Sequence, residues 1–526
     1  MTTREYGATV RTASGALQGS ARDGVFAFRG VPFAQGPVGS GRFAPPRSVE
    51  AWNGTRSAER QAAAPPQLAG NPPRPADSVT TGSALSTPEV IMGPLPVPGF
   101  SEDSLTLNIW TPSPGPDARL PVLVFFHGGA WKTGAGSASW YDGSVMSRRG
   151  QIVVVTVNYR LGALGWLYLP NGVGGKGPVA NLGLLDKIAA LEWLHDNIAA
   201  FGGDPDNITV SGESAGGQSI VALQATKAAG SFRRAIVDSI TLSESAVPGE
   251  VAAGITEIFL NAVGIEWRDP DKLLEFPVAR ILAAQAETMR LWNARATGEP
   301  YSPFEPVLDG LVITSDFAEA ALSGSMDDVE LLIAHTAQET RFWSAYDAEF
   351  WQQDEGTITG KLMEAADADR AQLYSAYAGL NTTASPAAAL SALADDEYIL
   401  PQLRLAERCS DKGRGAYFLW FSWPSPAADG RLGAAHTVDL PFVFKNFEEW
   451  SGGAILAGVD RGEFEALSTH VQDAWISFAT TGNPGRPLGQ EWPKFTAPEC
   501  AAMEFGKSVG LIRDLLRRRR NLYKGA

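Results

Sequence analysis

The stretch that decides the fold runs from residue 207 to residue 216 and reads Asn-Ile-Thr-Val-Ser-Gly-Glu-Ser-Ala-Gly. Its first five residues are typical of a short buried strand, and the residues after Ser214 can form a helix. A strand that turns abruptly into a helix strains the residue at the turn, so only small neighbours avoid a clash there. The G-x-S-x-G pattern therefore predicts that Ser214 is a nucleophile, exposed at the carboxyl edge of a sheet.

Strands and helices alternate around this turn. Residues 183–200 have the apolar spacing of a helix, and residues 105–110 alternate like a half-buried strand. Continuous apolar runs are typical of strands that are covered on both faces, and they occur at residues 121–126, 152–157, 235–237 and 331–333. This alternation predicts an α/β protein with a central, mostly parallel sheet flanked by helices.

No linker divides the pattern, so we expect residues 1–526 to form a single elaborated domain with long loop and helical insertions. Residues 61–100 are rich in Pro, Gly, Ala and Ser, which predicts a long surface loop. A flap over a pocket is the functional alternative for this segment.

Composition excludes several functions. The 526 residues carry 58 Asp and Glu against 43 Lys and Arg, a net charge of −15, so neither nucleic acid nor an anionic membrane is an expected partner. No apolar stretch approaches the ~20 residues that span a bilayer, and the first residues lack a signal core. The basic run 517–520 is interpreted as a solvated helix face. We expect a cytoplasmic protein.

Only two cysteines are present, Cys409 and Cys500. They are too few for a disulfide scaffold or for a cysteine-rich metal site. Neither a metal nor an organic cofactor is expected.

A glycine turn, His127-Gly128-Gly129-Ala130, follows directly after the predicted strand 121–126. Tandem glycines let backbone N–H groups approach a substrate without side chains in the way. With the N–H of Ala215, those of Gly128 and Gly129 are predicted to stabilise the negative oxygen of a tetrahedral intermediate. Losing one such donor typically costs about 3–4 kcal/mol of transition-state stabilisation. An ordinary turn is the alternative.

The general base can be chosen among five histidines. His127 belongs to the glycine turn, and His195 and His470 lie in helical patterns. His335 follows a strand but has no partner motif. His436 lies in a loop before an apolar segment, and it fits the chain order nucleophile, acid, base.

The acid should lie between Ser214 and His436, in a loop after a strand. Glu339 follows the predicted strand 331–333 and is the preferred candidate. Asp309 and Asp238 remain alternatives, because the pattern alone does not separate them.

Further motifs extend along nearly the whole chain. They are Phe28-Arg29-Gly30-Val31-Pro32-Phe33, Glu102-Asp103-Ser104-Leu105-Thr106-Leu107-Asn108, Asn158-Tyr159-Arg160-Leu161-Gly162, Gly183-Leu184-Leu185-Asp186, Gly202-Gly203-Asp204-Pro205 and Gly482-Asn483-Pro484. With them the chain resembles the type-B carboxylesterase family, the branch of α/β hydrolases that includes cholinesterases and bacterial para-nitrobenzyl esterases.

The resemblance implies an α/β-hydrolase fold and a serine carboxylesterase with a Ser-His-Glu triad. It maps Glu339 onto the acid of the family and His436 onto its base, and it assigns Ser214, Gly128, Gly129 and Ala215 the roles predicted above. Glu213 and Asp439 fall on acidic positions near the triad, where a structural role is favoured.

This chain departs from the family in three places. Ser104 stands where the family has a cysteine, and no cysteine lies near residues 65–67, so the usual disulfide is absent. The motif around Glu339 is the weakest match. Thr437 replaces the glycine that follows the base.

Trp131, Phe342 and Trp343 are candidates to line a substrate pocket, with core packing as an equal alternative for each. Their bulk favours a small-molecule ester with an apolar or aromatic group. A related carbamate, amide or lactone, a thioesterase or acyl-transferase reaction, and a non-catalytic binding protein on the same fold remain alternatives. The sequence does not indicate an oligomeric state.

Overall fold

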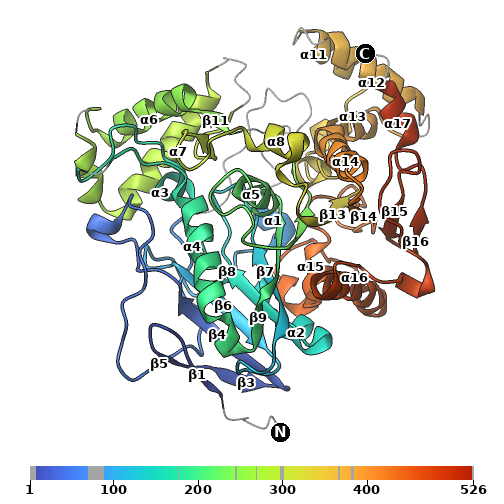
Figure 1. Cartoon of the computed structure of the whole chain (residues 1–526). Helices are drawn as coiled ribbons and strands as arrows, with labels where there is room; N and C mark the ends of the chain where they lie inside the picture. Colours follow the sequence, from blue (N-terminus) through green and yellow to red (C-terminus); the bar gives the residue numbers. More distant parts are fainter. Residues whose placement is uncertain are drawn as a thin grey trace.

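The computed structural model describes residues 7–523 apart from 69–87, 176, 243–245, 268, 296–300, 365–367 and 381–383. A large twisted sheet runs through the centre of the molecule, with helices on both of its faces (Figure 1). In the described part of the chain the sheet has eleven strands, in the order β16-β15-β14-β13-β10-β9-β7-β8-β6-β4-β3. Their bounds are Val509–Ile512, Ala502–Phe505, Tyr417–Phe421, Glu330–Thr336, Arg234–Asp238, Gly203–Glu213, Leu120–Phe126, Val153–Val157, Thr106–Thr111, Val25–Pro32 and Ser20–Arg22.

The central part of this sheet is parallel. Strand β7 pairs in parallel with β8 and β9, and β9, β10, β13, β14 and β15 continue the parallel pairing in turn. The pairings from β8 through β6 and β4 to β3, and that of β15 with β16, are antiparallel. The strands expected from the sequence are confirmed, and the mostly parallel sheet flanked by helices is an α/β-hydrolase fold.

Strand β7 shows why apolar runs without alternation become central strands. Val122, Val124 and Phe126 point into one apolar core, whereas Leu123 and Phe125 point into another on the opposite face. The first core is covered by α4 (Leu182–Asn197) and α5 (Ala215–Leu223), and the second by α2 (Ser144–Gly150) and α16 (Arg461–Thr481). Both faces of the strand are therefore apolar because both are buried.

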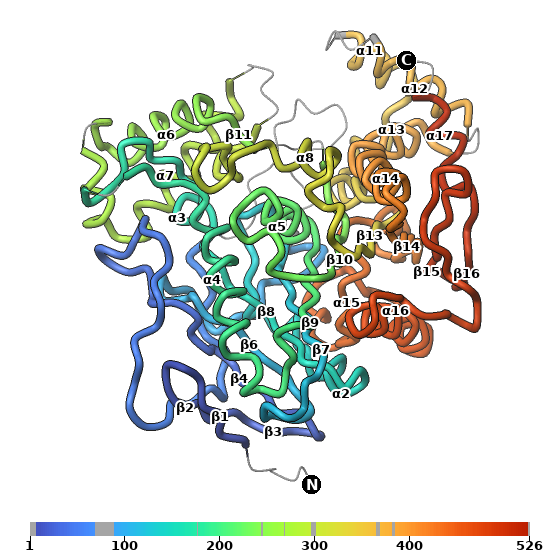
Figure 2. The backbone as a smooth tube through the Cα atoms, viewed as in Figure 1, coloured from blue at the N-terminus to red at the C-terminus, as the bar shows by residue number. Residues whose placement is uncertain are grey.

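Helical insertions widen the molecule above the sheet (Figure 2). On one side lie α6 (Gly249–Val263) and α7 (Val278–Asn293), and on the other α11 (Glu355–Glu364), α12 (Ala368–Leu380), α13 (Pro386–Ala394) and α14 (Asp396–Asp411). Of the predicted loop 61–100, the described parts contain only the short helix α1 (Pro88–Met92) and no regular strand, and the rest lies outside the described residues. No helix among the described residues is long and apolar enough to cross a bilayer.

The basic run at the end of the chain differs from the expected solvated face. It forms α17 (Arg517–Leu522), which lies against the α12–α14 insertion (Figure 1). Arg519 pairs with the buried Asp396, and Arg520 pairs with Glu407, so both guanidinium groups are largely buried. The interpretation was wrong for these two residues, because α14 offers each of them a carboxylate, the buried Asp396 and the partly exposed Glu407.

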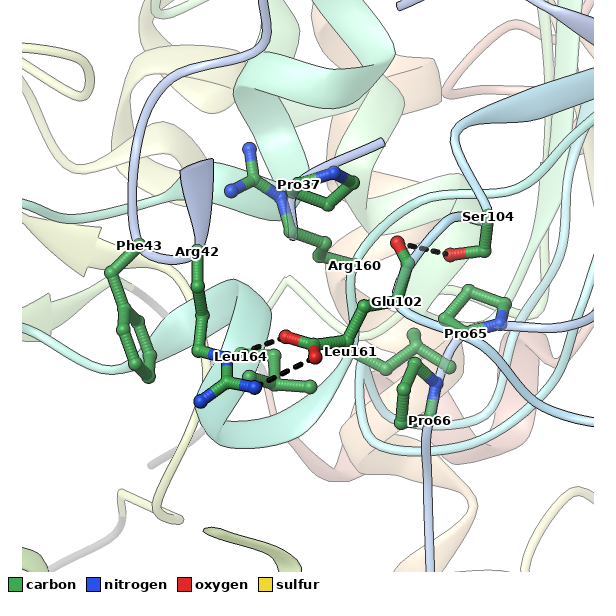
Figure 3. Close-up of a pocket in the computed structure, with 10 residues that line it drawn as sticks. All are labelled: Pro37, Arg42, Phe43, Pro65, Pro66, Glu102, Ser104, Arg160, Leu161 and Leu164. Atoms are coloured by element: carbon green, nitrogen blue, oxygen red, sulfur yellow. Dashed lines mark hydrogen bonds and ion pairs between the residues drawn. The ribbon is translucent and has the colours of Figure 1, made fainter. Parts of the chain in front are cut away.

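Both cysteines are free and buried. Ser104 lies beside Pro65 and Pro66 around a small cavity, which Figure 3 shows next to the ion pair of Arg42 with Glu102. Two parallel bonds of 2.5 and 2.7 Å join that guanidinium to that carboxylate. The segments that would carry the disulfide of the family therefore lie together, and a buried ion pair stands next to them.

Candidate active site

Ser214 occupies a strained turn between β9 and α5. Its backbone has φ 55° and ψ −128°, a combination that a residue with a side chain rarely adopts. The N–H of Ser214 donates to the carbonyl oxygen of Asp238 at the end of the neighbouring strand β10, over 2.9 Å. The predicted strand, sharp turn and helix are therefore all present, with Ser214 at the carboxyl end of the parallel strands.

The two glycines of the G-x-S-x-G pattern let the backbones around Ser214 come together. A Cβ atom on Gly216 would lie 2.0 Å from the carbonyl oxygen of Phe126, at the end of β7. A Cβ atom on Gly212 would lie 2.5 Å from the carbonyl carbon of Gly216. Real Cβ contacts are never this short, so the close packing of β7, β9 and α5 requires glycine at both positions.

The glycine turn after β7 packs directly against this serine. A Cβ atom on Gly128 would lie 2.3 Å from a carboxylate oxygen of Glu213 and 3.0 Å from Cβ of Ser214. The next residues, Gly129 and Ala130, have φ angles of 105° and 52°. Within the part of the chain that the structure describes, the N–H groups of Gly129, Ala130 and Ala215 donate to no protein acceptor.

Ala130 is a candidate donor that the sequence analysis missed. Its N–H lies in the same left-handed turn as that of Gly129. The signal was its small side chain directly after the tandem glycines, which leaves the backbone as accessible as at a glycine.

Glu339 and His436 meet although 97 residues separate them. Glu339 lies in the turn between β13 and α9 (Arg341–Ser344), and His436 lies in the loop between β14 and α15 (Leu440–Phe444). Nδ1 of His436 is 2.5 Å from Oε2 of Glu339, and the N–H of Thr336 donates to Oε1 over 3.0 Å. Both side chains are buried, and the candidate acid and base form one hydrogen-bonded pair.

The two alternative acids have other surroundings. Asp309 sits in a turn, where its carboxylate accepts the N–H groups of residues 311–313. Asp238 is fully buried, and its carboxylate accepts a hydrogen bond from the hydroxyl of Ser239 over 3.3 Å. Neither carboxylate reaches the imidazole of His436 in the way that Glu339 does.

The other imidazole nitrogen of His436 faces a second carboxylate. Nε2 lies 3.1 Å from Oε1 of Glu213, within ion-pair distance but without hydrogen-bond alignment. Among the described residues no hydrogen bond joins Nε2 to Ser214, the residue that follows Glu213 in the same turn. The imidazole is thus held between the carboxylates of Glu213 and Glu339.

Four buried carboxyl groups share this region, and their pKa values diverge. Burial raises the pKa of Glu213 to about 8, and burial with a nearby carboxylate raises that of Asp238 well above its usual range. Burial also raises the pKa of Asp439. At Glu339, burial acts in the same direction, but His335 and His436 outweigh it and lower the pKa to about 2. Of the four, Glu339 is therefore the group whose ionised form is favoured most strongly.

Two histidines of this region are pushed in opposite directions. Burial alone lowers the pKa of His436, but the carboxylates of Glu213 and Glu339 outweigh it and raise this pKa to about 9. Burial lowers the pKa of His335 to about 4, which leaves it neutral, with Nδ1 3.3 Å from Glu339. The sequence analysis missed this contact of His335, since no motif marks it.

Aromatic rings surround the base. The ring centres of Phe342, Trp343 and Tyr398 lie 5.9, 5.1 and 5.9 Å from that of His436. Trp131 lies instead in the core beside α5, where its indole N–H donates to Ser219 over 3.0 Å. Phe342 and Trp343 therefore adjoin the site, whereas the burial of Trp131 favours the packing alternative. No group of His, Cys, Asp or Glu among the described residues is arranged to hold a metal ion.

Comparison with known proteins places this geometry in a family. The model of the carboxylesterase family matches residues 7–521. The chain is 34% identical over 510 residues to phenmedipham hydrolase of Pseudarthrobacter oxydans, covering 96% of this chain and 97% of that protein. It is 34% identical over 489 residues to para-nitrobenzyl esterase of Bacillus subtilis, covering 92% of each.

A solved structure agrees with these relatives. The structure of the Geobacillus stearothermophilus carboxylesterase EST55 at pH 6.2 superposes with a TM-score of 0.80 at 32% identity, covering 98% of this chain and 99% of that one. The sheet order, the strained serine and the match along the chain lead to one conclusion. The protein belongs to the carboxylesterase family and is a carboxylic ester hydrolase with the α/β-hydrolase fold.

Proposed function

We propose that the protein hydrolyses small carboxylic esters in two steps, through a covalent acyl-enzyme on Ser214. The observation that carries this proposal is the buried pair of Glu339 and His436 next to the strained serine turn. A serine needs an adjacent base to become a nucleophile, and that base needs a third group to orient it.

In the first step, Nε2 of His436 accepts the proton of Ser214 while the serine oxygen attacks the ester carbonyl. Nε2 faces Glu213 at 3.1 Å, so the hydrogen bond with the serine forms as the substrate is bound. Glu339 accepts the hydrogen bond from Nδ1–H, which fixes the tautomer and stabilises the imidazolium. His436 then gives its proton to the leaving alcohol.

The tetrahedral intermediate places a negative charge on the former carbonyl oxygen. The proposed donors to this oxygen are the backbone N–H groups of Gly128, Gly129 and Ala215. We add the N–H of Ala130, because Ala130 lies in the same left-handed turn as Gly129. In the second step water attacks the acyl-enzyme, and His436 again acts as the base.

Glu213 and Asp439 are proposed to position and tune the base. The carboxylate of Glu213 lies beside Nε2 of His436, where it favours the imidazolium that forms during each step. The carboxyl group of Asp439 also favours the imidazolium, by less than those of Glu213 and Glu339. Neither group needs to contact the substrate for these effects.

The rings of Phe342, Trp343 and Tyr398 support a substrate with an apolar or aromatic group. The names of two relatives supply specific probes, a para-nitrobenzyl ester and phenmedipham. A panel that also contains an amide, a lactone and a thioester separates the remaining alternatives by their kcat/KM values. A cytoplasmic location is proposed from the composition of the chain.

The test compares hydrolysis of a short-chain para-nitrophenyl ester by the wild type and by Ser214→Ala. We expect the variant to lose at least about 10⁴-fold in kcat, since removing a nucleophile leaves only binding and oxyanion stabilisation. Ser451→Ala, at an exposed serine, is the control and should keep full activity. Wild-type turnover by Ser214→Ala would refute the serine mechanism.

A further inference from the structure

Lys132 follows the glycine turn, and the structure buries its charge. Its side chain is 5% exposed, and Nζ pairs with Oε1 of Glu305 over 2.9 Å. The same Nζ donates to the carbonyl oxygen of Ala130 over 3.2 Å. A lysine is rarely buried unless it is paired, so this ammonium group has a defined structural task.

The hydrogen bond from Lys132 to Ala130 lies in a strained part of the backbone. Gly129, Ala130 and Trp131 adopt three positive φ angles in a row, of 105°, 52° and 56°. Residues with a Cβ atom rarely adopt such angles and keep them only where their surroundings enforce them. The carbonyl of Ala130 lies in the middle of this run, so the bond from Lys132 acts on the part of the turn under strain.

The partner of Lys132 is itself held in place. Glu305 lies two residues before the short strand β12 (Val307–Leu308), which begins at Val307. The side chain of Asn181, at the start of α4, donates to the carbonyl of Val307 and accepts its N–H, both over 2.8 Å. A continuous set of bonds therefore joins the sheet-covering helix α4 to the turn that carries the oxyanion donors.

We propose that Lys132, clamped by Glu305, is a positioning residue that fixes the peptide unit between Ala130 and Trp131 and thereby stabilises the strained turn in which the N–H groups of Gly129 and Ala130 point toward the oxyanion. The carbonyl of Ala130 shares its rigid peptide plane with the N–H of Trp131, so holding it fixes ψ of Ala130 and, through that residue, the turn that carries the two preceding amides. The inference rests on the proposed serine mechanism.

The test uses Lys132→Met, which keeps the length of the side chain and removes its charge. We expect kcat for a para-nitrophenyl ester to fall about tenfold to a hundredfold, somewhat less than the loss of a whole oxyanion donor, with KM within about twofold of the wild type. The inhibition constant of a trifluoromethyl ketone, which forms a tetrahedral adduct with the serine, should weaken by a similar factor.

Three further variants make the result specific. Lys132→Arg keeps the charge and should recover most of the activity. Glu305→Gln should show a smaller loss than Lys132→Met, and the double variant should lose no more than Lys132→Met alone. Lys445→Met removes another half-buried lysine that pairs with a glutamate and a backbone carbonyl, and should leave kcat unchanged.

Two results would overturn the proposal. One is wild-type kcat and ketone affinity in Lys132→Met while Ser214→Ala is inactive. If circular dichroism shows that Lys132→Met does not fold, the test passes to Glu305→Gln. Wild-type kcat and ketone affinity in Glu305→Gln would then overturn the proposal. Full activity of Ser214→Ala would instead refute the underlying mechanism, so the two failures are distinguishable.

Discussion

Ser214 and His436 belong to the same site but are held by different forces. Around Ser214 the backbones of β7, β9 and α5 pack so closely that Gly212 and Gly216 leave no room for a Cβ atom. Around His436 the chain forms loops, and carboxylates hold the imidazole at both of its nitrogens. Steric packing fixes the proposed nucleophile, whereas buried charge fixes the proposed base.

The surroundings of Ser214 and those of His436 should therefore tolerate different kinds of substitution. The serine side should be sensitive to volume, because packed backbone cannot move aside. The base side should be sensitive to charge and pH, because its geometry depends on which carboxyl groups are ionised.

Glu339→Gln should cause the largest loss, about 10³- to 10⁴-fold in kcat, because the amide no longer stabilises the imidazolium or fixes its tautomer. Ester hydrolysis measures this loss in kcat, and circular dichroism confirms that the variant is folded. Asp309→Asn is the matched control, since Asp309 only accepts backbone N–H groups in a turn. Loss of activity in Asp309→Asn, with Glu339→Gln unaffected, would move the acid to the other residue.

Gly216→Ala should destabilise the protein by about 3 kcal/mol, because the added Cβ atom would lie 2.0 Å from the carbonyl oxygen of Phe126. Urea unfolding measures this change. Gly254→Ala, on α6 with open space around the glycine, should instead stabilise by about 0.5–1 kcal/mol. Equal effects at the two glycines would show that packing does not fix the serine turn.

Glu213→Gln should change the pH dependence of kcat/KM. The base acts when it is neutral, so the wild-type value should rise with pH through a midpoint near pH 9, where the pKa of His436 lies. Removing a carboxylate that favours the imidazolium lowers that pKa, so the rise should move to lower pH. Asp439→Asn should move the rise in the same direction by less. A shift of the rise to higher pH in Glu213→Gln would contradict the role proposed for Glu213.

Lys187→Met should give the smallest effect, a stabilisation of about 1–2 kcal/mol. Lys187 is a fully buried charge on the packed side, with Nζ 3.0 Å from the ring centre of Tyr159. Burial lowers its pKa well below the usual range. The unfolded chain binds that proton more readily, so the penalty grows as pH falls, and the gain should be larger at pH 6 than at pH 9.

Thermal unfolding at the two pH values measures the change. Lys227→Met, at an exposed lysine paired with Glu192, should shift the midpoint little. A loss of stability in Lys187→Met at pH 6 would show that this buried amine stabilises the fold.

The same division explains what the sequence could predict. The serine turn is local, since one strand, one turn and one helix meet within residues 207–223, so its pattern is readable along the chain. Glu339 could not be separated from Asp309 and Asp238 by pattern alone, because its contact with His436 joins segments 97 residues apart. Its place after a predicted strand made it the preferred candidate, and the family resemblance strengthened that preference before the structure brought the two together.

Other features of the base side had no sequence signal. Two contacts depend on how β9, β13 and β14 align in the sheet, namely the approach of Glu213 to Nε2 of His436 and the contact of His335 with Glu339. Residue types alone do not specify such distances. Aromatic side chains are ambiguous in the same way, since Trp343 adjoins the base while Trp131 fills the core.

The most direct test of the serine mechanism is covalent labelling with a dialkyl nitrophenyl phosphate, followed by peptide mass spectrometry. Attack by the serine oxygen on phosphorus releases nitrophenol and leaves a dialkyl phosphoryl group on the side chain. We predict one label per chain, on Ser214, formed as activity is lost and greatly slowed in Glu339→Gln. Complete inactivation with the label on another residue, or with Ser214 unmodified, would contradict the account.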